Sequence, residues 1–159
     1  MLIRSKKVWS SSQFLPLTIE VEDNKIVAIY DYNHFDKVDY DFGDERILPG
    51  FIDVHTHGAY GYDTNDVNEE GLRNWTKNVV SEGVTSFLPT TITQTEEVLL
   101  KAVANVAKVY NEGYEGAEIL GIHFEGPYLD EEKRGAQPLS CIQTPSVEQF
   151  KKFQAASKN

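Results

Sequence analysis

The chain has 159 residues, of which 40% are hydrophobic and 25% are charged, a composition typical of a soluble globular protein with a sizeable core. Its 25 acidic residues outnumber its 15 basic residues, so the formal net charge is −10. A surface this acidic repels phosphate backbones and anionic lipids, which disfavours nucleic-acid and membrane binding. A small anionic substrate remains compatible with this charge, because a local pocket can differ in sign from the whole surface.

The chain contains one cysteine, Cys141, so it cannot form an intrachain disulfide bond. This cysteine usage suits a reducing cytosol. The first residues include no apolar run of signal-peptide length, and no stretch approaches the ~18 apolar residues of a membrane span. We therefore expect a cytoplasmic protein.

Residues 1–48 predict a small antiparallel β module, the N-terminal strands of a small β-sandwich. The β-rich runs cover residues 2–9, 18–21 and 25–30, with a turn-forming cluster at 22–24. An acidic, tyrosine-rich segment follows, and His34 within it is expected to be a solvated surface residue. A short apolar run at Ile47 and Leu48 closes the module.

The pattern changes after Pro49–Gly50. Phe51 to His55 form a short apolar run that is typical of a buried strand. Residues 68–82 then follow a helical period and end before Gly83, a favourable C-terminal stop. The predicted apolar stripe of this helix consists of Leu72, Trp75, Val79 and Val80.

The alternation of strand and helix then repeats. Residues 84–88 predict a second strand, 95–110 a second helix and 119–124 a third strand. The predicted buried face of the second helix contains Leu99, Val103, Val106 and Tyr110. A third helix is expected from residues 144–146, with Pro145 at its first position and Ser146 and Gln149 as a capping box.

The strands begin near residues 51, 84 and 118, a spacing of roughly 33 residues that suits one βα unit of a (β/α)8 barrel. The sequence thus predicts an α/β fold in which residues 49–159 form the first three βα units of an incomplete barrel. A small doubly wound sheet is the alternative, because it needs no further strands.

Metal-binding residue types gather at the end of the first of these strands. His55 and His57 form a His-x-His pair, and residues i and i+2 of a strand point to the same face. Two imidazoles so placed can bind one divalent metal. Asp53 lies on the same face, and we expect it to orient a ligand imidazole through the free ring N–H. A bare His-x-His is more often structural, but the full string PGFIDVHTHG favours a metal site.

The third strand ends in GIHFEGPYL, where a carboxylate and an imidazole again lie two residues apart. Glu125 is placed to reach a metal held by the first strand, and Gly126–Pro127 turns the chain sharply behind it. A lone Glu near a turn is usually solvated, yet two strands that offer ligands at the same end favour a shared site. His123 is expected to be a supporting residue outside the metal's own ligands.

The loop after this turn reads DEEKRGAQP. Backbone N–H groups of Ala136 and Gln137 are candidates for contacting a ligand, and Lys133 and Arg134 for attracting a phosphate. Without further context, a charged surface loop is the alternative interpretation.

Taken together, PGFIDVHTHG, GVTSFLPTTIT, GIHFEGPYL and KRGAQP resemble the N-acetylglucosamine-6-phosphate deacetylase family of the amidohydrolase superfamily, and specifically its N-terminal portion. The resemblance implies metal-dependent hydrolysis of the acetamide of N-acetylglucosamine 6-phosphate to glucosamine 6-phosphate and acetate. It implies that Glu125 is the principal metal ligand. It also implies that His55 and His57 mark the members with a second ion, so one or two ions of zinc, iron or another transition metal are expected.

The resemblance further implies that Ala136 and Gln137 contact the sugar phosphate. Two more metal-binding histidines, the catalytic aspartate and the main phosphate-binding residues are expected on later strands, after Asn159. No catalytic residue is therefore expected within these residues, and this chain alone is expected to be inactive. We expect the full-length protein to be a homodimer.

Two other functions remain open from the sequence. One is a different amidohydrolase that acts on a cyclic amide. The other is a self-contained α/β module that binds a metal or a partner without catalysis.

Overall fold

The computed structural model describes residues 1–157, and the chain divides into two compact units, Met1–Pro49 and Gly50–Asn159. The end of the predicted range 49–159 lies outside the described residues. Among residues 1–157, no helix combines the length and apolar character that a bilayer crossing requires.

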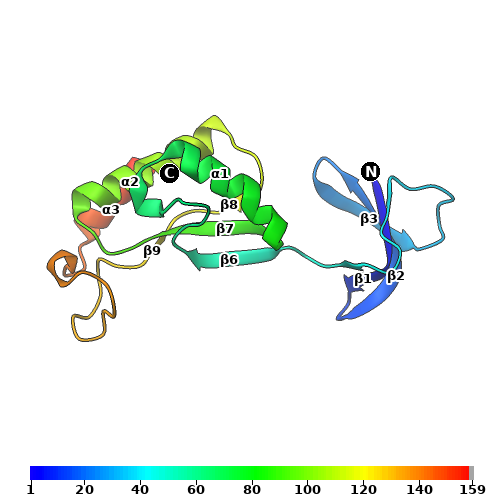
Figure 1. The fold of residues 1–159 in the computed structure, drawn as a ribbon, viewed down its shortest axis with the longest axis horizontal. Helices are drawn as coiled ribbons and strands as arrows, with labels where there is room; N and C mark the ends of the chain where they lie inside the picture. The colour runs from blue at the N-terminus through cyan, green and yellow to red at the C-terminus, as the bar shows by residue number, and fades with distance from the viewer. Residues whose placement is uncertain (158–159) are drawn as a thin grey trace. The chain divides into compact units, whose positions relative to one another are not determined.

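The first unit is built on three antiparallel strands (Figure 1). They are β1 (Leu2–Ser10), β2 (Gln13–Glu22) and β3 (Lys25–Asp31), in the order β3-β2-β1. Two-residue turns at 11–12 and 23–24 join them, and all four turn residues have positive φ. Two successive residues with positive φ give the turn twist that matches the twist of paired strands.

The prediction of an antiparallel module is wrong on the side of β1 that faces away from β2. The short strands β4 (Tyr40–Asp41) and β5 (Arg46–Ile47) both pair with β1 in parallel. The acidic segment holds this edge in place, because the Arg4 guanidinium binds Asp41 at 2.8 Å. The buried Ser5 hydroxyl donates a short hydrogen bond to the carbonyl of Glu45. As predicted, His34 is exposed; it stacks on Tyr30.

The second unit contains a parallel sheet of β6 (Phe51–Thr56), β7 (Val84–Thr91) and β8 (Glu118–Ile119), with β9 (His123–Phe124) also paired to β7. The helices α1 (Glu69–Val79) and α2 (Glu96–Glu112) follow β6 and β7, and α3 (Val147–Ser157) follows β9. Figure 1 shows α1 and α2 on the same side of the sheet, with consecutive strands adjacent.

The core of this unit lies between α1, α2 and the sheet. Its centre is Trp75, which contacts Phe87 of β7 with ring centroids 4.6 Å apart. Both side chains are almost fully buried, in agreement with the place of Trp75 in the predicted apolar stripe. Val80 and Tyr110 are exposed, so their predicted burial is wrong. Val80 leaves the stripe because α1 ends at Val79 and continues as a tighter 3₁₀ turn. Tyr110 and Ile119 line a groove at the edge of the sheet.

The observed helix ends agree with those predicted from the sequence, except at α3. Asn68 caps α1, Thr95 caps α2, and Gly83 ends the 3₁₀ turn with a φ of 85°. At α3 the Ser146 hydroxyl accepts from the N–H of Gln149 at 3.2 Å, which is one half of the predicted capping box.

The other half of that capping box is absent. The Gln149 side chain is buried and bonds Tyr128, Glu96 and Gln143 instead. Pro145 lies outside the helix, before Ser146, and not at its first position. A buried amide needs partners for all its polar atoms, and the neighbouring segments supply them better than the helix end does.

Two strand predictions are also corrected. The third strand is interrupted at Leu120–Ile122, because β7 carries Pro89 opposite this segment and proline has no N–H to donate. The first strand, β6, is not buried: Phe51, Ile52 and Val54 are 66%, 63% and 58% exposed. It pairs only with β7 among the described strands, whereas the core helices pack on β7 and β8.

Candidate metal centre

The two histidines of the His-x-His pair come from the end of β6. His55 lies within the strand and His57 directly after it. The Thr56 N–H between them donates to the Thr90 hydroxyl at 3.0 Å, which ties this end of β6 to β7. The imidazole Nδ1 of His57 lies 3.1 Å from the carbonyl oxygen of Thr90.

Glu125 follows β9 and is held at the same end of the sheet through its backbone. Its N–H donates to the Thr91 carbonyl at 3.1 Å, and its own carbonyl accepts from the Thr93 hydroxyl at 3.4 Å. Gly126 then turns the chain with a φ of 88°, and a Cβ at this position would overlap the Thr93 side chain. Glycine is therefore required where the chain leaves the site.

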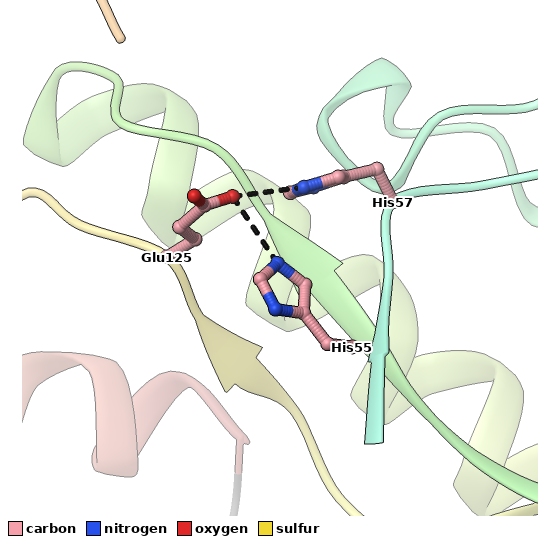
Figure 2. A group of neighbouring side chains, drawn as sticks. All are labelled: His55, His57 and Glu125. Carbon is pink, nitrogen blue, oxygen red and sulfur yellow. Dashed lines mark hydrogen bonds and ion pairs between the residues drawn. The ribbon is translucent and has the colours of Figure 1, made fainter. Parts of the chain in front are cut away.

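The three predicted metal-binding side chains converge (Figure 2). The Oε2 atom of Glu125 lies 3.2 Å from Nε2 of His55 and 2.9 Å from Nε2 of His57. All three ligand atoms lie within 4.8 Å of one another. The side chains are 32–49% exposed, so the group sits at the surface of the unit and is open to a ligand.

The contact of His57 with Thr90 fixes where the lone pair of that imidazole points. A carbonyl oxygen can only accept, so Nδ1 of His57 carries the proton and its Nε2 presents a lone pair in the neutral ring. That lone pair faces a carboxylate oxygen of Glu125, which is also an acceptor. Two acceptors at 2.9 Å are attracted only when a proton or a cation lies with them, so the geometry suits a bound cation.

The donor set also fits a transition metal. Two imidazole nitrogens and one carboxylate oxygen are ligands that zinc and iron accept. Ligand atoms bound about 2.0–2.1 Å from a tetrahedral zinc lie about 3.3 Å from each other. The 3.2 Å separation between His55 and Glu125 is close to that value, and the 2.9 Å separation between His57 and Glu125 is shorter. The hydrogen bond from Nδ1 of His57 to a carbonyl is the outer contact that metal-bound histidines usually make.

Asp53 lies near the group but contacts a different atom from the one expected. Its Oδ1 accepts from the backbone N–H of His55 at 3.1 Å, and no described imidazole hydrogen-bonds to it. Asp53 thus supports the main chain at His55, a candidate ligand, whereas it was predicted to accept from an imidazole N–H.

His123 packs against the group without joining the three ligand atoms. Its ring meets that of His55 edge-on with centroids 4.7 Å apart, and its Nδ1 lies 3.3 Å from the Thr90 hydroxyl. Burial and then the nearby His55 lower the pKa of His123 below its ordinary value, which favours the neutral ring.

The loop residues predicted to contact a substrate lie in a segment that is hydrogen-bonded within the chain. The Gln137 N–H donates to the Arg134 carbonyl at 3.2 Å, and its side-chain oxygen accepts from the Thr93 N–H at 2.7 Å. The Arg134 guanidinium bonds the carbonyl of Gln137 at 2.7 Å, so it stabilises the loop. Ala136 is exposed at the tip. Through Thr93, this loop is tied to the segment that also holds Glu125.

Sequence reasoning missed the contribution of Thr90. This buried residue of β7 contacts the backbone N–H of Thr56, which lies between His55 and His57, and the rings of His57 and His123. The string TSFLPTT has polar residues at both ends, so nothing in the sequence distinguishes Thr90 from the other threonines of this strand.

Comparison with known proteins places these residues within a family. The Amidohydrolase family model matches residues 46–155. Among curated proteins, the N-acetylglucosamine-6-phosphate deacetylase of Lysinibacillus sphaericus is 39% identical over 89% of this chain and 37% of its own length. The enzyme of the same name from Bacillus subtilis is 44% identical over 70% of this chain and 29% of its own length.

Solved structures agree with the sequence comparisons. The N-acetylglucosamine-6-phosphate deacetylase of Pasteurella multocida matches 99% of this chain and 42% of its own, with a TM-score of 0.82 and 28% identity. A Mycobacterium smegmatis deacetylase, solved in complex with N-acetyl-D-glucosamine-6-phosphate, shares the fold with a TM-score of 0.88 at 24% identity. The chain spans less than half the length of these relatives. It belongs to the amidohydrolase family and, as its sequence motifs indicated, matches a portion of N-acetylglucosamine-6-phosphate deacetylases.

Proposed function

We propose that this chain carries part of the metal site of an enzyme that deacetylates N-acetylglucosamine 6-phosphate, releasing glucosamine 6-phosphate and acetate. The observation that carries the proposal is the convergence of His55, His57 and Glu125, from two separate strands, in a chain that matches deacetylases of this name. The substrate is taken from the relatives' names and from the ligand of the Mycobacterium smegmatis structure.

The chain's own residues have separate tasks in this proposal. Glu125 supplies the negative charge that a divalent cation needs, while His55 and His57 supply neutral nitrogen ligands. Zinc, iron or another transition metal, as one or two ions, would lower the pKa of a water molecule and polarise the amide carbonyl. Asp53 and Thr90 hold the backbone on either side of His55 in place.

The loop at residues 133–137 is proposed to approach the sugar phosphate. Lys133 and Ala136 are exposed there, and the hydrogen bond between Gln137 and Thr93 links the loop to the Glu125 segment. A lysine ammonium is a suitable partner for a phosphate in an otherwise acidic protein.

We further propose that the parallel sheet of the second unit is the beginning of a (β/α)8 barrel. Consecutive strands are adjacent and α1 and α2 share one face, as in a barrel wall, whereas a doubly wound sheet covers both faces (Figure 1). The candidate metal-binding residues lie at or directly after the carboxyl ends of β6 and β9, where barrel enzymes place their sites. The first unit would contribute strands to a small β-sandwich.

The proposal is tested with a chimera in which this chain replaces the matching 37% of the Lysinibacillus sphaericus relative. Acetate release from N-acetylglucosamine 6-phosphate is measured with zinc, with iron and after chelation, and a cyclic amide serves as the alternative substrate. We expect metal-dependent release from the sugar phosphate alone.

A Glu125→Gln chimera is the matched control, because it changes one ligand and leaves the side-chain volume intact. Hydrolysis of the cyclic amide in preference to the sugar phosphate would reassign the substrate. A folded, metal-loaded chimera without either activity would overturn the proposal.

A further inference from the structure

Regular backbone pairing between β6 and β7 is interrupted at the metal-binding end. The register shifts between Asp53 and Thr56, so the segment that contains His55 lies in an irregularity of the ladder. A bulge frees a strand to aim a side chain, but it removes the backbone hydrogen bonds that would otherwise fix its position. Other contacts must hold the His-x-His segment in place.

A single residue of β7 supplies two such contacts. The Thr90 hydroxyl accepts from the Thr56 N–H at 3.0 Å, and the Thr90 carbonyl accepts from Nδ1 of His57 at 3.1 Å. The same hydroxyl lies 3.1 Å from the Leu88 carbonyl and 3.3 Å from Nδ1 of His123. One arrangement satisfies all partners: the hydroxyl donates to Leu88 and accepts from the two N–H groups.

Burial makes these contacts difficult to replace. Thr90 is 0% exposed, so water has no access to take over a hydrogen bond that is lost there. The hydroxyl holds the main chain between the two histidines, and the carbonyl selects the tautomer of His57 that directs Nε2 toward Glu125.

We propose that Thr90 is the positioning residue of the metal centre: its hydroxyl bridges the bulge in β6 and thereby keeps the imidazole of His57 in its metal-binding tautomer and orientation. The inference rests on the metal-binding part of the proposed function. Thr90 acts through His57 and is not itself a ligand.

The neighbouring residue provides a matched control. Thr91 is equally buried, but its hydroxyl oxygen has no hydrogen-bond partner among the described residues. The same substitution, threonine to valine, therefore removes a bridging hydroxyl at position 90 and an unpaired one at position 91. Thr90→Ser keeps the hydroxyl and removes only a methyl group.

The experiment uses the chain itself, labelled with ¹⁵N. The ring nitrogen signals of His57 report its tautomer without metal, and a zinc titration followed by NMR gives the affinity even where binding is weak. Thr90→Val is expected to mix the two tautomers of His57 and to weaken zinc binding by about 10- to 100-fold. Thr90→Ser is expected to stay within about threefold of the parent chain, and Thr91→Val to change neither readout.

The outcomes separate this inference from the function on which it rests. An unchanged tautomer and an unchanged zinc affinity in folded Thr90→Val overturn the positioning role. If the parent chain binds no zinc but Thr90→Val still mixes the tautomers, the positioning role stands and the metal site fails. Should Thr90→Val not fold, Thr90→Cys replaces it, because a thiol is a weak acceptor of similar size. Equal behaviour of Thr90→Cys and Thr90→Ser would then refute the proposal.

Discussion

The Nδ1 atom of His57 lies 3.1 Å from the carbonyl oxygen of Thr90, a residue of the neighbouring strand. Because a carbonyl oxygen can only accept a hydrogen bond, Nδ1 carries the proton. In the neutral ring the lone pair therefore lies on Nε2, which is 2.9 Å from Oε2 of Glu125. The backbone carbonyl of Thr90 thus orients the imidazole of His57 so that it can bind a cation together with Glu125.

Replacing Glu125 by glutamine should weaken zinc binding to this chain by more than about 10-fold, since the amide lacks the negative charge that offsets the charge of the ion. Calorimetric or NMR titration measures the affinity. Glu131→Gln, in the exposed loop that follows, is the control and should leave the affinity unchanged. Equal affinities for the parent chain and the Glu125 variant would remove Glu125 from the ligand set.

Adjacent valines at the end of α1 test how the core is arranged. Val79 is 6% exposed and Val80 is 44% exposed, although both belong to the apolar stripe predicted from the sequence. Val79→Ala should lower the free energy of unfolding by about 2 kcal/mol, because it removes buried methyl groups. Val80→Ala should change it by no more than about 0.5 kcal/mol. Denaturant unfolding monitored by circular dichroism measures both, and equal losses would contradict the observed helix end.

Val79 and Val80 also show how far the fold could be predicted from the sequence. Periodicity located α1 and α2, because their apolar residues repeat at helical spacing. It could not show that α1 tightens into a 3₁₀ turn at Val80, since that change depends on how the chain reaches Gly83. It also missed the parallel pairing of β4 and β5, because strands of two residues have no measurable period.

The convergence of the three candidate ligands could be predicted for a similar reason. Two residues at i and i+2 near a strand end share a direction, so His55 and His57 could be paired, and Glu125 joined them because parallel strands end at one edge. The role of Thr90 was not readable, because it depends on a register shift that only the paired strands reveal. The contact of Asp53 with a backbone N–H was missed for the same reason.

Gly126→Ala should destabilise the second unit and displace Glu125. The φ of 88° disfavours any residue with a Cβ, and the added methyl group would overlap the Thr93 side chain, whose hydroxyl bonds the Glu125 carbonyl. We expect a loss of about 1–3 kcal/mol in unfolding free energy, together with weaker zinc binding. Gly135→Ala is the control, since its φ is also positive but no atom lies within 4 Å of the added methyl; it should retain zinc affinity. Unchanged zinc binding in Gly126→Ala would show that this turn does not position Glu125.

The first unit should lose stability in acid through Asp41. The Arg4 guanidinium and then the Gly43 N–H hold the pKa of this carboxyl below its ordinary value. A lowered folded-state pKa means that the stabilisation is present above the unfolded pKa of about 3.9 and is lost as the pH falls through the folded-state pKa. Asp41→Asn should therefore be less stable than the parent chain at pH 7, and the difference should shrink below about pH 4. The indole N–H NMR signal of Trp9 follows this unit alone, and Asp36→Asn is the control. A difference that does not depend on pH would exclude this linkage.

Finally, the chain by itself should bind zinc weakly and should not deacetylate N-acetylglucosamine 6-phosphate. The three converging side chains are 32–49% exposed, so water competes with them for the ion and screens its charge. The apolar side chains of β6 are exposed, and no described strand pairs with its outer edge. The strand that carries His55 is therefore less rigid than a hydrolytic site requires. The same exposed surface should promote self-association, which sedimentation velocity can measure across concentrations. We expect acetate release by the chain to be more than about 10³-fold slower than by the chimera with its relative. Comparable turnover, from a chain that is monomeric and unfolds cooperatively, would mean that these residues form a complete catalytic module and that the site lies elsewhere than at His55, His57 and Glu125.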